Sequence, residues 1–130
     1  MNRYSYSLLG SLIAIVSARA YVSLGGTLNF TIFNHTLHHL YYGLVLLILA
    51  GILRTRKFPE PLIFFTIGLG LGCLCDEFDL LLSIGRPYTM QLYYAPLNLA
   101  MDTILILVLF RLSENRNYVH GLLYDTEHVL

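Results

Sequence analysis

Charged residues are scarce in this chain of 130 residues. Asp, Glu, Lys and Arg together make up 12% of it, against about 25% in an average soluble domain. Hydrophobic residues make up 56%, and the mean hydropathy is +0.64. This balance indicates that lipid rather than water surrounds most of the chain. The length suits one domain, so we expect a single compact bundle.

The sequence also lacks an excess of charge of either sign. Eight basic residues balance eight acidic ones, and no basic run is interleaved with aromatic residues. Nucleic-acid binding is therefore not expected, because it needs a concentrated positive surface. The partners that we expect are membrane lipids, together with further copies of the chain (a homo-oligomer) or a larger membrane complex.

Cysteine is rare, and its positions argue against two common kinds of site. Cys73 and Cys75 lie two residues apart, which places them about 200° apart around a helix, so we expect no disulfide between them. A C-x-C pair that holds a metal normally needs a second pair of soft ligands, which this chain lacks. We expect both thiols to be buried and inert. No serine–histidine–acid order and no cysteine nucleophile with a base stands out.

Long apolar stretches are abundant instead. Four of them have close to the roughly 20 residues that span the hydrocarbon core of a bilayer. They cover residues 5–24, 37–53, 62–82 and 92–110. Proline and glycine break the chain between them. We predict an all-α fold, an integral membrane four-helix bundle in residues 1–112, followed by a polar C-terminal tail in residues 113–130.

The first apolar segment has a second interpretation. It follows Arg3, and Ala18-Arg19-Ala20 matches the A-x-A cleavage site of a secretory signal. Cleavage at this site would leave three spans. We expect the segment to be present as a transmembrane helix.

Basic residues give the orientation, because Lys and Arg near the ends of spans prefer the cytoplasmic side. Only Arg86 falls in the loops on one side of the predicted bundle. The other side holds Arg3, Arg54, Arg56, Lys57, Arg111 and Arg116. Both termini, the tail and the loop before the third span are therefore predicted to be cytoplasmic, and the membrane to be the plasma membrane.

Several ionisable residues fall inside the predicted spans, where each costs about 2.5–3.5 kcal/mol and usually marks function. At about 1.5 Å per residue, Asp76 lies about 21 Å from the cytoplasmic side, in the outer third of the core. Arg19 reaches a similar depth, and Asp79 lies about 4.5 Å further out. Asp102 lies about 15 Å into its span, near the midplane.

Helical spacing places these groups on shared faces, because residues three or four apart are neighbours. One face at the start of the second span carries His35, His38 and His39. One stripe on the third span carries Gly68, Gly72, Asp76 and Asp79. The two glycines are expected to let another helix approach closely and to bring its polar side chains towards the carboxylates.

The predicted polar layer holds more negative than positive charge. Only Arg19 opposes the acidic residues, which are Asp76, Glu77, Asp79 and Asp102. Such an excess requires protons on some carboxylates or bound cations. Imidazole and carboxylate ligands suit Zn²⁺, Fe²⁺ or Mn²⁺. We predict a divalent transition metal held by His35, His38, His39, Asp76 and Asp79, with Asp102 and Glu77 as catalytic residues.

Three functions fit this layer. A metal-dependent enzyme would activate water or oxygen against a lipid-like substrate from the outer leaflet. A proton or cation transporter would use the same carboxylates, with Asp102 extending the layer inwards. An accessory subunit would use the packing glycines to stabilise a larger membrane complex. A structural ion pair between Arg19 and Asp76 is a further alternative, which needs no ligand.

Overall fold

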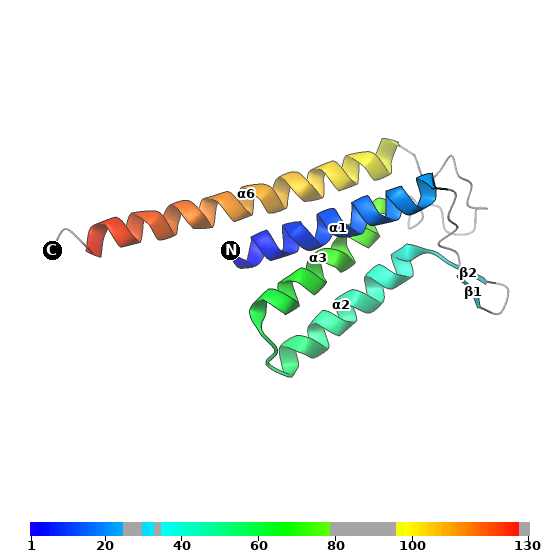
Figure 1. Ribbon diagram of the computed structural model, residues 1–130, viewed down its shortest axis with the longest axis horizontal. Coiled ribbons are helices and arrows are strands. Elements are labelled where there is room, and N and C mark those ends of the chain that lie inside the picture. Colours follow the sequence, from blue (N-terminus) through cyan, green and yellow to red (C-terminus); the bar gives the residue numbers. More distant parts are fainter. Residues whose placement is uncertain (25–29, 33–34, 79–95, 128–130) are drawn as a thin grey trace.

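Four helices and one small hairpin make up the described part of the chain. The computed structural model describes residues 1–24, 30–32, 35–78 and 96–127, with side chains for 1–24, 38–78 and 96–114. The helices are α1 (Arg3–Ser23), α2 (His39–Thr55), α3 (Glu60–Asp76) and α6 (Pro96–Glu127) (Figure 1). Strands β1 (Phe30–Ile32) and β2 (His35–Leu37) pair in antiparallel register. The four predicted helices are confirmed, and the hairpin is an unpredicted addition.

Local sequence sets the ends of the helices. The side chain of Asn2 accepts a hydrogen bond of 3.0 Å from the backbone N–H of Ser5, which caps α1. α3 has a proline, Pro61, in its first turn, where a missing N–H leaves no helical bond unmade. Between α2 and α3, Lys57 has a positive φ of 57°, and the N–H of Phe58 donates to a carbonyl oxygen near the end of α2. The resulting tight turn makes α2 and α3 antiparallel neighbours.

Several helix boundaries differ from the prediction, and one of them is the end of α3, at Asp76 rather than at residue 82. α2 begins at His39, and His38 precedes it with an extended backbone (φ −76°, ψ 156°). His35 lies in β2, so the prediction that the three histidines share one helical face is wrong. The β-branched and aromatic residues of this segment favour strand over a further turn of helix. α6 continues to Glu127, beyond the predicted end of the fourth span near residue 110.

α3 lies at the centre of the bundle and contacts α1, α2 and α6. Glycines make its contact with α1 close, because a Cβ atom at Gly68 would overlap the backbone of Ser7 and one at Gly72 would lie 2.8 Å from the carbonyl oxygen of Ser11. The predicted approach of another helix to the glycine stripe is confirmed, and that helix is α1. The hydroxyls of Ser7 and Ser11 donate across this interface to the carbonyl oxygens of Phe64 and Gly68.

Both cysteines, Cys73 and Cys75, are free thiols and are partly exposed, so the prediction that they are buried is wrong.

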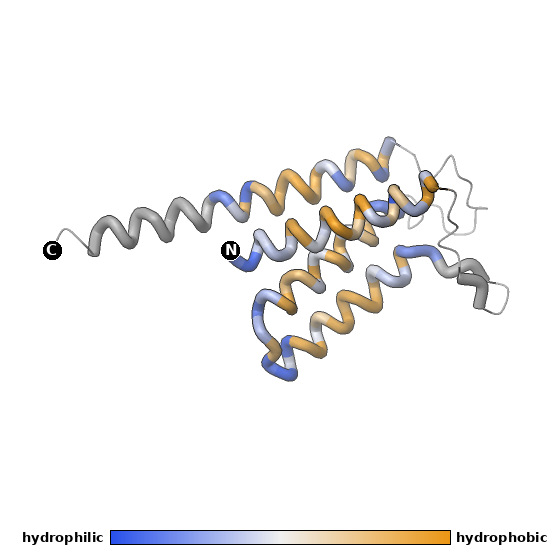
Figure 2. The backbone as a smooth tube through the Cα atoms, in the orientation of Figure 1, coloured by the Kyte–Doolittle hydropathy of each residue, from blue (hydrophilic) through white to orange (hydrophobic). Residues whose placement is uncertain are grey.

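The interior of the described bundle holds buried polar groups beside apolar ones such as Leu40 and Ile63, and many large apolar side chains are exposed on its outer faces. Asp76 is 0% exposed, whereas Val16, Val45 and Leu107 on the outer faces are 63%, 61% and 57% exposed. Figure 2 shows hydrophobic residues along the middle of the helices and hydrophilic residues towards their ends. α1 and the part Pro96–Glu114 of α6 are each long and apolar enough to cross a membrane.

Candidate functional site

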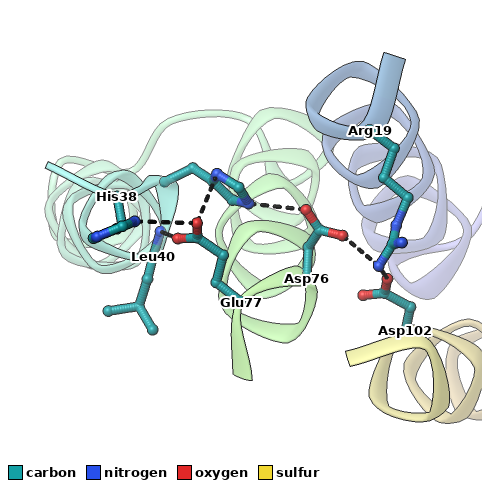
Figure 3. A network of polar contacts seen from close by, with 7 residues as sticks. Arg19, His38, Leu40, Asp76, Glu77 and Asp102 are labelled. Carbon is teal, nitrogen blue, oxygen red and sulfur yellow. Dashed lines mark hydrogen bonds and ion pairs between the residues drawn. The ribbon is translucent and has the colours of Figure 1, made fainter. Parts of the chain in front are cut away.

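A cluster of ionisable side chains occupies the end of the bundle opposite the α2–α3 turn (Figure 3). Every helix contributes to it, and we call it the polar centre. Its members are Arg19 from α1, His38 and His39 at the start of α2, Asp76 and Glu77 at the end of α3, and Asp102 near the start of α6.

Arg19 joins three helices through a single nitrogen atom. Its Nη2 atom lies 2.7 Å from Oδ1 of Asp76 and 2.7 Å from Oδ2 of Asp102. The side chains of Asp76, Asp102 and Arg19 are 0%, 8% and 19% exposed. Two carboxylates therefore share one permanent positive charge where little water can reach them. The close contact of α1 with the glycines of α3 brings the guanidinium to this level.

His39 continues the chain of contacts from α3 to α2. Its Nε2 atom lies 2.8 Å from Oδ2 of Asp76, and its Nδ1 atom lies 3.3 Å from Oε1 of Glu77. Nδ1 of His38 lies 3.4 Å from the same oxygen of Glu77. A neutral imidazole carries a proton on only one ring nitrogen, so His39 donates to both carboxylates only in its protonated form. The protonation of His39 is thus linked to both acids.

Glu77 also completes the start of α2. Its Oε2 atom accepts a hydrogen bond of 2.9 Å from the backbone N–H of Leu40. The first N–H groups of a helix have no partner within the helix, and the positive end of the helix dipole favours a carboxylate there. The sequence does not reveal this contact, because it joins residues 37 positions apart. Its only signal is that α2 has no capping side chain of its own.

Asp102 lies in the same layer as Asp76 rather than deeper in the bundle. Its predicted depth of about 15 Å assumed a helix that starts near residue 92. The same Nη2 atom of Arg19 lies 2.7 Å from an oxygen of Asp102 and 2.7 Å from an oxygen of Asp76, which places the two carboxylates at one level. Within the described helices, the acidic residues of the polar centre form one layer near one end of the bundle.

The predicted metal ligands fall only partly within the described side chains. Asp79 lies outside the described residues, and the side chain of His35 is outside them too. Among the residues that are described, no group of three or more His, Cys, Asp or Glu side chains is arranged to hold a metal ion. His39 and Asp76 do lie together, but the two oxygens of Asp76 face Arg19 and His39.

Permanent charges alone do not balance in the polar centre. The centre holds three carboxylates and one guanidinium, and its other basic groups are two imidazoles. The centre becomes neutral when its imidazoles or carboxylates hold two protons in total. The net charge of the polar centre therefore depends on how many protons these groups hold.

No protein-family model matches the sequence, and no curated protein or solved structure matches it. The functional argument rests on the geometry and charge of the polar centre.

Proposed function

We propose that the chain is an integral membrane protein with four spans and cytoplasmic termini. Its exposed apolar faces and buried ionisable groups are the arrangement that a lipid solvent favours. Arg3, Lys57 and Arg111 lie towards the end of the bundle opposite the polar centre, as expected if that end is cytoplasmic. α2 and α3 have 17 residues each, at the lower limit for a span.

Within that placement, we infer that the polar centre takes up and transfers protons near the outer face of the membrane. One observation carries this proposal: acidic and basic groups alternate along an unbroken series of contacts of 2.7–3.4 Å. The groups that can exchange a proton follow the order His38, Glu77, His39 and Asp76, whereas Arg19 keeps its proton and supplies the fixed positive charge between Asp76 and Asp102. Chains of acidic residues and histidine inside a membrane are a known means of moving protons.

A purely structural role would need fewer charges. One guanidinium and one carboxylate suffice to hold α1 against α3, as the contact between Arg19 and Asp76 does. Asp102 and Glu77 add buried negative charge, which costs free energy unless protons or cations compensate it. An excess of expensive groups inside a span therefore supports a role beyond packing.

Infrared difference spectroscopy on the protein in lipid nanodiscs tests the proposal. Carboxyl and imidazole groups absorb differently when protonated and deprotonated, so a pH step reports which groups change. We expect signals that are altered in Asp102→Asn and Glu77→Gln but kept in the control Glu114→Gln, whose side chain is 51% exposed on α6. Proton transfer would be contradicted if no carboxyl or imidazole of the polar centre responded to pH.

Proton transfer at this centre serves acid–base chemistry in our proposal, rather than transport. The transporter hypothesis relied on an Asp102 that lies deeper in the membrane than the other carboxylates. Asp102 lies beside Asp76 instead, so this support for a transporter is lost. We expect proteoliposomes that contain the protein to show no proton flux above protein-free vesicles. A flux that is abolished by Asp102→Asn would instead identify a transporter. Association with further copies or with a larger complex stays a prediction.

A divalent metal ion is the second candidate, and one pair of distances favours it. Nδ1 of His38 and Nδ1 of His39 lie 3.4 Å and 3.3 Å from one oxygen of Glu77. Ligand atoms around a tetrahedral Zn²⁺ with bonds of about 2.0–2.1 Å are separated by roughly 3.3–3.4 Å. The side chains of His35 and Asp79, the other predicted donors, lie outside the described residues, and a bound ion would activate water. Elemental analysis decides: a stoichiometric transition metal that is lost in His38→Ala supports the site, and its absence removes it.

A further inference from the structure

A small pocket with charged walls lies at the end of the bundle opposite the polar centre, where α1 starts, α2 ends and α3 starts (Figure 1). Its volume is about 140 Å³, and we call it the arginine pocket. It shares no residue with the polar centre. The lining residues are Arg3, Arg54, Glu60, Ile63, Phe64 and Ile67.

Arg3 brings to this pocket a hydrogen-bond donor that the fold leaves without an acceptor. Its Nε atom is buried, and no acceptor in the described part of the chain is within hydrogen-bond distance of it. Nη2 of the same guanidinium donates to the hydroxyl of Tyr4 at 3.3 Å, and Cζ lies 5.9 Å from the centre of the Phe64 ring. Phe64 also lines the pocket, so the guanidinium lies at its wall. A buried donor without a partner is unfavourable, and an acceptor bound in the pocket removes that penalty.

The charges around the pocket favour an anion with a single negative charge. Arg3 and Arg54 supply two permanent positive charges and Glu60 supplies one negative charge, which leaves one positive charge in excess. Glu60 forms no ion pair with either arginine among the described side chains. The volume is below the roughly 300–1,000 Å³ of pockets that enclose a whole ligand, so the pocket suits a small anionic group.

We propose that the arginine pocket binds a phosphate group, held by the guanidinium groups of Arg3 and Arg54. Guanidinium matches the geometry of phosphate oxygens better than any other side chain. The phosphodiester of a phospholipid carries one negative charge, which equals the positive excess of the pocket. Arg54 and Glu60 are exposed, so the group enters from the surface of the bundle.

A phospholipid of the cytoplasmic leaflet is one source of this phosphate, and free phosphate is the other. The lipid source rests on the membrane placement proposed above, in which this end of the bundle faces the cytoplasm, where basic pockets between spans bind lipid head groups. Binding of phosphate itself does not rest on that placement. A phosphate between Arg3 and Arg54 also joins α1 to α2, which make little direct contact with each other.

Native mass spectrometry of the full chain in detergent, titrated with dioleoyl phosphatidylglycerol, tests the proposal. In about 0.15 M ammonium acetate, exposed charges more than about 8 Å from the ligand are largely screened. Dioleoylglycerol has the same chains without the phosphate and should bind at least about tenfold more weakly, because it makes no charged hydrogen bonds. Inorganic phosphate distinguishes the sources. Weaker binding than phosphatidylglycerol supports the lipid, and equal binding supports free phosphate in the same pocket.

Two adjacent arginines at the end of α2 provide a matched pair of variants. Arg54→Gln should weaken binding of phosphatidylglycerol about tenfold, because a hydrogen bond to a charged group is lost. Arg56→Gln removes the same charge outside the lining of the pocket and should change the Kd less than about twofold. Glu60→Gln should have the opposite effect and tighten binding about twofold to fivefold, because it removes a negative charge from the wall. Arg3→Gln should weaken binding like Arg54→Gln.

Three results would overturn the proposal. Equal binding of dioleoylglycerol and phosphatidylglycerol would show that the chains are recognised and the phosphate is not. Equal weakening by Arg54→Gln and Arg56→Gln would show a general attraction of anions to the basic end of the bundle. No binding of either phosphate compound would show that the pocket holds no anion. Circular dichroism verifies that each variant is folded. A negative infrared result at the polar centre leaves these binding constants unaffected, so the two proposals fail separately.

Discussion

Replacement of Arg19 by glutamine tests whether one guanidinium holds together the end of the bundle that carries the polar centre. The substitution keeps a long polar side chain but removes the positive charge that Asp76 and Asp102 share. Breaking a buried ion pair by removing one partner costs about 3–5 kcal/mol, because the other charge stays buried without compensation. Arg19 is 19% exposed, so we expect a loss near the lower end of that range.

The two aspartates should differ from Arg19 in a defined order. Asp102→Asn keeps an oxygen that can accept from Arg19 and leaves one guanidinium opposite Asp76, so we expect a change within about 1 kcal/mol. Asp76→Asn should cost more, because Asp76 also faces His39. The double variant Arg19→Gln/Asp102→Asn should regain part of the loss, with a coupling energy of about 0.5–3 kcal/mol.

Thermal unfolding followed by helical circular dichroism in detergent measures these losses, since the chain has no tryptophan to report by fluorescence. The matched control is Arg111→Gln. Arg111 pairs with Glu114 at 3.6 Å, but the two side chains are 80% and 51% exposed, so its loss should not be measurable. The reasoning is refuted if Arg19→Gln unfolds like the wild type, or if Asp102→Asn costs as much as Arg19→Gln.

Packing, capping and orientation can be tested in the same preparations. Gly68→Ala should destabilise the bundle, because the added Cβ would overlap the backbone of Ser7. The control Gly51→Ala adds a Cβ that meets nothing within 4 Å, so it should be neutral or stabilising by up to about 1 kcal/mol. Equal unfolding temperatures of the two variants would contradict this. Glu77→Gln keeps an acceptor at the start of α2 but removes the charge, so unfolding should show a loss of about 1 kcal/mol, and no loss would argue against the cap. Lys57→Cys should react with an impermeant reagent only from the cytoplasmic side, and reaction from outside would reverse the topology.

Features that depend on local periodicity could be predicted from the sequence, and features that depend on where helices start could not. The level shared by Arg19 and Asp76 follows from counting residues along two spans that run in the same direction. The glycine stripe likewise predicted a close helix contact. The level of Asp102 was missed, because it is set by a contact with Arg19, a residue 83 positions away, which counting along one span does not reveal.

The histidine pattern also shows that helical spacing alone does not reveal where a helix begins. The spacing of His35, His38 and His39 suits one helical face, yet the chain forms a strand at His35 and begins α2 at His39. The first turn of α2 is completed by Glu77 from another helix, so no local pattern could place it. The sequence periodicity therefore did not show which residue completes the first turn of α2, because that depends on a tertiary contact.

The contact between Glu77 and Leu40 connects α2 and α3 at a second end, in addition to the turn between them. One end is joined covalently by the turn at Lys57, and the other end is fastened by the hydrogen bond to Leu40 and the imidazole contacts of Glu77. The two helices cannot splay apart at the end that carries the polar centre without breaking the hydrogen bond between the N–H of Leu40 and the carboxylate of Glu77. The helices α2 and α3 are thus fixed to each other at both ends, and any shift of α1 or α6 against this pair at the polar centre must break the contacts of Arg19 with Asp76 or Asp102.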